Sequence, residues 1–259
     1  NTINQFEMLQ SLELPYATFK KLRAYAAKHQ ISFLSTAFDC QSLEFVINSL
    51  GIERIKIPSG ELNNAPLLVA AGQSGLPILM STGMSDMYEI ERALKYIVYG
   101  KLYDKPPKNV SAFDIDLNRE GLYEFLLDTV TLLQCTSEYP TPVKNLNLNN
   151  IKSISERFRL PVGLSDHSIG IEAPIAAVAM GAVVIEKHFT LSHDLEGPDH
   201  LASLLPEELG DMVKNIRRTE KALGSSIKKP TKSENKTKLQ VRKGLYARCK
   251  ISKGEKIGD

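Results

Sequence analysis

Two short apolar runs in this chain each break abruptly into polar residues and a histidine, at 163–168 and at 185–190. An alanine-rich helical pattern fills the interval between His167 and His188. A strand, a helix and a second strand of these lengths form a βαβ unit, whose strands are parallel neighbours. Both imidazoles would then lie at carboxyl ends of adjacent strands, where α/β folds bind ligands. Two imidazoles that converge there could hold a metal ion, although each could instead hydrogen-bond within its own loop.

Two histidines are too few for a closed structural zinc site, which takes four protein ligands. They suit an open site that water and a substrate oxygen complete, in which the ion polarises the substrate. Cys135 is a candidate third ligand, although a lone buried cysteine is more often a packing residue.

The other expected strands also end in hydroxyls, glycine turns or charges: Ser35-Thr36, Lys56 with Ser59-Gly60-Glu61, Ser81-Thr82-Gly83, and Thr136 with Glu138-Tyr139. Hydroxyls, backbone NH groups and one lysine together form an anion pocket, most naturally for phosphate. Lys56 alternates with two isoleucines, so it faces a barrel interior if they face the helices. An inward lysine is costly unless it meets an anion or an acid. The alternative partner is Glu61 or Glu186 in an ion pair.

Six expected strands alternate with helical patterns along the chain, beginning near residues 32, 54, 77, 129, 161 and 182. This regular spacing favours a (β/α)8 barrel of the TIM type over an open doubly wound sheet, because no glycine-rich dinucleotide turn occurs. Six of the eight βα units are visible, and we expect the two further strands to precede Asn1.

The chain divides into three parts by composition. Residues 1–223 form the expected barrel domain, which ends in an amphipathic helix from Pro206. Residues 224–240 are rich in Lys, Ser and Thr without an apolar stripe, which is typical of a linker. Residues 241–259 contain one expected strand, 244–248, and are too short to fold alone. We interpret them as the start of a second domain.

Composition excludes several classes of function. A net charge of +2 gives no electrostatic argument for binding nucleic acid or membrane surfaces. The apolar runs are far too short to cross a bilayer. The three cysteines are odd in number and lack CxxC spacing, so they resemble reduced thiols. We therefore expect a cytoplasmic α/β protein.

Six motifs, in this order, closely resemble the sialic acid synthase family of N-acetylneuraminate, legionaminate and pseudaminate synthases. They are Ile57-Pro58-Ser59-Gly60-Glu61, Ser81-Thr82-Gly83-Met84, residues 135–142, Gly163-Leu164-Ser165-Asp166-His167, Glu186-Lys187-His188-Phe189-Thr190 and Gly197-Pro198-Asp199-His200. The resemblance also identifies Lys243–Ala247 as the start of the family's C-terminal antifreeze-like (SAF) domain.

The resemblance implies condensation of phosphoenolpyruvate with an N-acetylated mannosamine-type sugar and water, giving a nine-carbon 2-keto sugar acid and phosphate. By motif match, His167 and His188 would bind Mn²⁺ or Mg²⁺. Phosphoenolpyruvate would contact a second set, namely Lys56, Ser59, Ser81 and Ser165, with Thr36 nearby. The sugar would face Glu61, Tyr139 and Asp199. Lys56, Glu61 and the two histidines are the candidate catalytic residues.

The family also implies a homodimer that exchanges its C-terminal domains, so that an arginine of the partner reaches the sugar. A glutamate and a lysine on its first two barrel strands complete the site, and neither strand is in this sequence. Two rival functions stay open. One is a 3-deoxy-octulosonate-type phosphoenolpyruvate-sugar synthase, and the other is a non-catalytic barrel that only binds a phosphorylated ligand.

Overall fold

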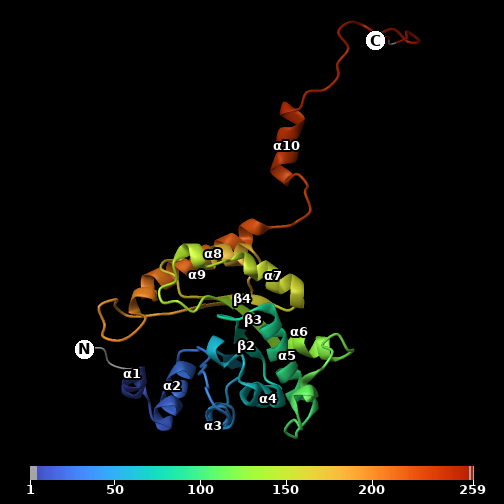
Figure 1. Cartoon of the computed structure of the whole chain (residues 1–259). Coiled ribbons are helices and arrows are strands. Elements are labelled where there is room, and N and C mark those ends of the chain that lie inside the picture. Colours follow the sequence, from blue (N-terminus) through green and yellow to red (C-terminus); the bar gives the residue numbers. More distant parts are fainter. Residues whose placement is uncertain (1–4, 257, 259) are drawn as a thin grey trace. The chain divides into compact units, whose positions relative to one another are not determined.

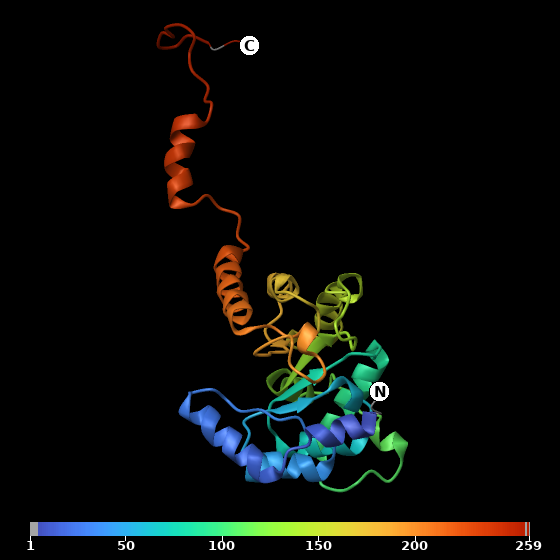
Figure 2. The ribbon, with the colours of Figure 1, turned by 90° about the vertical axis from the view of Figure 1, so that its left-hand side faces the viewer.

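The computed structural model describes residues 5–256 and 258, and the chain divides into two compact units, 1–222 and 223–259. In the first unit, five parallel strands pair in chain order to form one sheet. They are β1 (Ile55–Ile57), β2 (Ile78–Ser81), β3 (Val130–Cys135), β4 (Val162–Asp166) and β5 (Ile185–Lys187). The sheet curls and carries its helices on the outside (Figures 1 and 2). This architecture confirms a TIM-type α/β barrel fold.

Within the described residues, helices connect the strands, three α-helices precede β1 and one long helix follows β5. They are α1 (Gln5–Leu12), α2 (Tyr16–Lys28), α3 (Cys40–Glu44), α4 (Ala65–Ser74), α5 (Met87–Leu102), α6 (Leu122–Thr129), α7 (Asn149–Phe158), α8 (Glu172–Ala179) and α9 (Pro206–Leu223). No helix among the described residues is long and apolar enough to span a membrane.

Helices α4 and α5 begin with side-chain caps. The Asn64 side chain accepts a hydrogen bond from the Leu67 NH at 3.2 Å, which caps α4. At α5, Asp86 accepts from the Glu89 NH and Glu89 accepts from the Asp86 NH, at 2.8 and 3.0 Å. This reciprocal capping box satisfies two backbone donors and fixes where α5 leaves the end of β2.

Two expected strands do not form. Residues 32–37 lead toward α3 without ladder hydrogen bonds, because β1 pairs only with β2 among the described residues. Residues 244–248 have no strand partner either, and they are exposed. A strand requires a neighbour for its backbone groups, and alternating side chains alone do not supply one.

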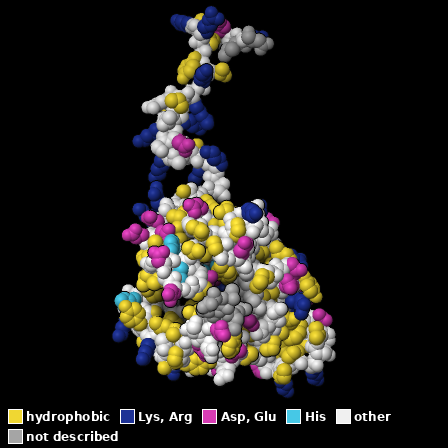
Figure 3. Space-filling model, turned by 60° about the vertical axis from the view of Figure 1, so that its left-hand side comes forward, with side chains coloured by type: hydrophobic (Ala, Val, Ile, Leu, Met, Phe, Trp, Pro, Cys, Tyr) yellow, Lys and Arg dark blue, Asp and Glu magenta, His cyan; other side chains and the backbone are white. Residues whose placement is uncertain are grey.

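The second unit contains a helix where the sequence indicated only a linker. Helix α10 (Lys232–Val241) begins with a capping box in which Thr231 and Glu234 bond each other's backbone NH groups. It buries no residue, so local capping and not packing defines it. Lysine and arginine side chains are frequent along this unit (Figure 3).

The core lies between the sheet and its helices. Ile55 and Ile57 are at most 2% exposed and pack in this core, whereas Lys56 points to the opposite face of the strand. Helices α4 and α5 cover β1 and β2 and pack on each other through glycines. A Cβ atom at Gly72 would collide with the carbonyl oxygen of Ile97, and one at Gly100 with that of Val69. The two helix backbones therefore touch directly.

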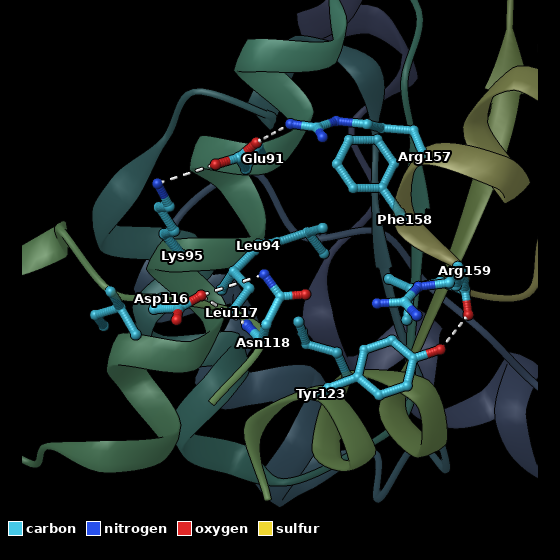
Figure 4. A pocket seen from close by; sticks show the side chains of 13 residues that line it. Glu91, Leu94, Lys95, Asp116, Leu117, Asn118, Tyr123, Arg157, Phe158 and Arg159 are labelled. Carbon is cyan, nitrogen blue, oxygen red and sulfur yellow. Dashed lines mark hydrogen bonds and ion pairs between the residues drawn. The ribbon is translucent and has the colours of Figure 1, made fainter. Parts of the chain in front are cut away.

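A cavity of about 200 Å³ lies between α5, α6 and the end of α7 (Figure 4). Glu91 of α5 forms ion pairs with Lys95 in the same helix at 3.1 Å and with Arg157 of α7 at 2.8 Å. The pair with Arg157 ties α5 to α7. Leu126 of α6 and residues 157–160 of the lining come shortly before β3 and β4 in the chain, which places this part of the cavity near the amino ends of those strands. In TIM-type barrels this end contributes to stability, and chemistry takes place at the other end.

Replacing Gly72 with alanine should destabilise the fold, because the new methyl group has no space between α4 and α5. We expect the free energy of unfolding to fall by about 1–3 kcal/mol. Gly210→Ala is the matched control: Gly210 is an exposed position in α9 with open space around it, so alanine should add about 0.5–1 kcal/mol. Urea unfolding measures both, and equal stability of the two variants would contradict the packing described here.

Candidate active site at the carboxyl ends of the strands

A cavity of about 670 Å³ opens at the carboxyl ends of the five strands. It is lined by Thr36, Phe38, Lys56, Pro58, Ser59, Gly60, Ser81, Met84, Cys135, Ser137, Tyr139, Ser165, His167, Glu186 and His188. The cavity thus brings together eight of the ten residues that the sequence indicates for the site. Glu61 and Asp199 are the two that do not line it.

Lys56 is the buried cation of this cavity, with a side chain only 7% exposed. Its ammonium donates to the Ser81 hydroxyl at 2.6 Å and lies 3.3 Å from the Glu186 carboxylate. The same carboxylate oxygen accepts from the Ser165 hydroxyl at 2.7 Å. The ion pair with Glu186, weighed above as an alternative to anion binding, is therefore formed. The opposite charge of Glu186 offsets the cost of burying the ammonium.

The turn after β2 contains Gly83, which lies against Ser59 and Ser137 of the cavity. The Gly83 NH donates to the Ser59 hydroxyl at 3.0 Å. A Cβ atom at Gly83 would collide with the hydroxyls of Ser137 and Ser59, so only glycine leaves room for this contact. Hydroxyls from three strand ends therefore line the same cavity as the Lys56 ammonium, which is the chemistry of an anion site.

His167 is held in a defined tautomer. Its Nδ1 lies 2.8 Å from the carbonyl oxygen of Thr136, and a carbonyl can only accept a hydrogen bond. Nδ1 therefore carries the proton, and a neutral ring presents the Nε2 lone pair. Cys135 approaches Nδ1, at 4.0 Å, and so lies on the donor side of the ring. This position does not suit the role of third metal ligand on Nε2.

His188 lies across the cavity from His167, with ring centroids 5.2 Å apart and planes at 80°. The Tyr139 ring covers both, with centroids 4.1 Å from His167 and 5.6 Å from His188. The Nδ1 atom of His188 is 3.8 Å from the Asp199 carboxylate, an ion-pair distance that is too long for a hydrogen bond. The two imidazoles therefore share one chamber beneath an aromatic cover.

The environment shifts the two histidines in opposite directions. Burial lowers the pKa of His188, and charge on the neighbouring His167 lowers it further. For His167, burial also acts to lower the pKa, but hydrogen bonds to the Cys135 thiol and the Thr136 carbonyl outweigh it and raise the pKa. His188 is thus favoured as a neutral imidazole, the form that can ligate a cation.

The two imidazoles fit one side of an open metal site. No group of three or more His, Cys, Asp or Glu side chains within the described ranges is arranged to hold an ion. His167 has its Nδ1 bonded to a carbonyl, which is the usual way in which a metal-binding histidine is oriented. The two rings would supply two nitrogen donors to such an ion, and substrate and water would have to complete its shell.

Glu61 and Asp199 lie beside the cavity. Glu61 ends the turn that carries Ser59, and its carboxylate accepts from the Asn64 side chain at 2.6 Å. Asp199 lines a smaller cavity of about 150 Å³ together with Tyr139 and His200. Tyr139 lines both cavities, so the smaller one is adjacent to the chamber on the side of this ring.

The rim of the chamber includes residues that the sequence alone did not indicate. Met84 and Ser137 follow β2 and β3 by a few residues, and Phe38 follows the segment 32–37, which forms no strand. Position after an expected strand was the available signal for all three. Phe38 is 62% exposed and Met84 is 74% exposed. Figure 3 shows exposed hydrophobic side chains interspersed with histidine and acidic groups on this unit. The mouth therefore has an apolar rim around a polar floor.

Comparison with known proteins decides the family. Residues 1–228 match the model of the NeuB family. The chain belongs to the NeuB family. It is 43% identical over 255 residues to N,N'-diacetyllegionaminic acid synthase of Campylobacter jejuni, covering 98% of this chain and 69% of that protein. The synthase of the same name from Legionella pneumophila is 42% identical over 253 residues, covering 98% of this chain and 65% of that protein.

A solved structure gives the same result for this NeuB chain. N-acetylneuraminic acid synthetase of Leptospira borgpetersenii is 31% identical and superposes with a TM-score of 0.75, covering 92% of this chain and 75% of that one. The chain spans about two thirds of the length of the two curated relatives. Membership of a family of synthases identifies it as an enzyme sequence.

The His167→Ala and His188→Ala variants should each lose Mn²⁺ binding, because one imidazole alone leaves the ion with a single protein nitrogen. We expect affinity to fall by more than about 100-fold, beyond the cost of losing an orienting partner. The free Mn²⁺ signal in electron paramagnetic resonance measures it. His29→Ala, on the exposed end of α2, should bind like the parent. Unchanged affinity in both site variants would place the ion elsewhere.

Proposed function

We propose that this chain is the barrel of a nonulosonic acid synthase. The reaction condenses phosphoenolpyruvate with an N-acetylated mannosamine-type sugar and water, giving a nine-carbon 2-keto sugar acid and phosphate. One observation carries the proposal. A single cavity joins a buried lysine among serine hydroxyls to a pair of imidazoles, so an anion and a carbonyl compound can lie side by side.

The lysine end suits phosphoenolpyruvate. Its phosphate and carboxylate would meet the Lys56 ammonium and the hydroxyls of Ser59, Ser81 and Ser165, with Thr36 at the edge. Charge-assisted bonds in a buried cavity are stronger than neutral ones. An incoming anion takes the place that the Glu186 carboxylate holds beside Lys56 in the ligand-free chain.

The histidine end suits the sugar aldehyde. A divalent cation, Mn²⁺ or Mg²⁺, held by His167 and His188 would supply polarisation of the aldehyde oxygen. Tyr139 covers both imidazoles and screens the reacting carbon from bulk water. Asp199 and Glu61, beside the chamber, would receive hydroxyls of the sugar chain.

The reaction then proceeds in two bond-forming steps. C3 of phosphoenolpyruvate bonds to the aldehyde carbon, and the aldehyde oxygen takes up a proton. Water adds at C2, the bond from C2 to the phosphate oxygen breaks, and a ketone and inorganic phosphate result. Lys56 with its serines stabilises the leaving phosphate, whose charge increases along this path.

The sugar and the assembly belong to the proposal as well. A nine-carbon product less the three carbons of phosphoenolpyruvate leaves a six-carbon sugar, and the relatives at 42–43% identity are named for a product with two acetyl groups. The sugar is accordingly an N-acetyl or a diacetamido hexose. The intact enzyme is a homodimer that exchanges its C-terminal domains.

Phosphate release by full-length enzyme tests this function. With phosphoenolpyruvate and Mn²⁺, N-acetylmannosamine or its diacetamido counterpart should release stoichiometric phosphate, and arabinose 5-phosphate should not. Activity with arabinose 5-phosphate alone would show a synthase of the octulosonate type. Binding of phosphoenolpyruvate without turnover of any sugar would show a binding-only barrel, and sedimentation of the same sample reports the dimer.

Lys56→Met should weaken phosphoenolpyruvate binding far more than sugar binding, because it removes the buried charge and keeps the length of the side chain. Loss of a charge-assisted contact costs about 2–3 kcal/mol, or about 30- to 150-fold in affinity. Titration calorimetry measures both ligands. Lys95→Met, in the remote pair with Glu91, is the matched control. Native phosphoenolpyruvate affinity in Lys56→Met would make the lysine only a partner of Glu186.

A further inference from the structure

A buried ion pair directly precedes the two histidines, and the chemistry above does not use it. Asp166 and Lys187 are register partners on β4 and β5. Their carboxylate and ammonium are 2.7 Å apart, with side chains 0% and 3% exposed. Each is the chain neighbour of an imidazole of the candidate site, His167 or His188.

The pair closes a ring of bonds around the end of β4. The second oxygen of Asp166 accepts from the Ser168 NH at 2.9 Å, and the Lys187 ammonium also donates to the Ser168 carbonyl oxygen. The residues on either side of His167 are thus tied to one ammonium on β5. A turn held at both sides has little freedom to shift its central side chain.

The alternation of the strands puts this pair behind the site. Ser165 and Glu186, the preceding register partners, are hydrogen-bonded on the cavity side. Asp166 and Lys187 therefore lie on the helix side, and the histidines return to the cavity side. Along the two strands, Ser165 and Glu186 therefore face the cavity, Asp166 and Lys187 face the helices, and the two histidines face the cavity again.

Each histidine backbone is also anchored outside the pair. The Thr141 NH donates to the His167 carbonyl and the Leu204 NH to the His188 carbonyl, both at 2.9 Å. These bonds hold each strand end to its own loop. Residues 166–168 at the end of β4 and residues 187–188 at the end of β5 are joined by the hydrogen bonds of the Lys187 ammonium.

We propose that Asp166 and Lys187 are a positioning pair, which fixes the relative placement of the His167 and His188 imidazoles so that both reach one divalent cation. The inference rests on the metal role in the proposed function. Neither residue touches substrate or metal. Their ion pair acts through the strand register and the 166–168 turn.

Stability and positioning can be separated because the pair is buried. Removing one partner leaves an unpaired charge in the interior and destabilises the fold. Replacing both partners with apolar residues of similar volume is often neutral for stability. A double variant, Asp166→Leu with Lys187→Met, therefore keeps the fold while it removes the bonds to Ser168.

The test compares this double variant with the parent in the full-length protein. We expect cooperative unfolding and near-native phosphoenolpyruvate affinity, with Mn²⁺ affinity about 10- to 100-fold weaker, as for lost orienting partners. In metal-free protein with labelled histidine, the ring-to-ring nuclear Overhauser effect between His167 and His188 should disappear. Glu91→Leu with Lys95→Met, an ion pair away from the strand ends, should change neither readout.

Native Mn²⁺ affinity and a native ring-to-ring signal in the folded double variant would overturn the proposal. A parent that binds no Mn²⁺ would defeat the metal role in the proposed function, and the ring-to-ring signal would still decide the positioning. If the double variant does not fold, Asp166→Asn decides. It keeps an acceptor for the Ser168 NH but weakens the ion pair, so both readouts should change in the same direction by a smaller amount.

Discussion

The parallel pairing of β4 with β5 is the constraint on which the site depends. In register, Leu164, Ser165 and Asp166 face Ile185, Glu186 and Lys187. Because side chains alternate between the faces of a strand, a slip of β5 by one residue would send the His188 imidazole to the helix side and the Lys187 ammonium into the cavity. The register of β4 with β5 therefore determines which side chains enter the apolar core and which enter the polar chamber.

Burial of polar groups in this barrel is tolerated because their partners lie on neighbouring strands. No buried side-chain nitrogen or oxygen in the described part of the chain lacks a hydrogen-bond partner. Thr82 donates to the Leu133 carbonyl and Gln134 to the Leu146 carbonyl, so even residues outside the cavity join adjacent segments. Each strand end is held by the next, which keeps the chamber in shape without a ligand.

Much of this arrangement could be predicted from local pattern. Alternation around Lys56 indicated its face, and the polar residues after the expected strands indicated where the chamber lies. Residues 32–37 and 244–248 have suitable strand patterns, yet pairing depends on a neighbour that no local pattern reports. The ion pair of Asp166 with Lys187 could not be predicted either, because it depends on the register of two strands and not on their separate compositions.

The contact of Lys56 with Glu186 has a consequence for which molecules the chamber accepts. Because a carboxylate already lies beside the ammonium, the chamber exerts little long-range attraction on anions in solution. An anion would bind there favourably only if its own oxygens replaced those of Glu186 beside Lys56 and also reached the serine hydroxyls. Small inorganic ions that satisfy one contact gain little from the exchange. An anion that binds in this chamber would therefore have to match several contacts at once.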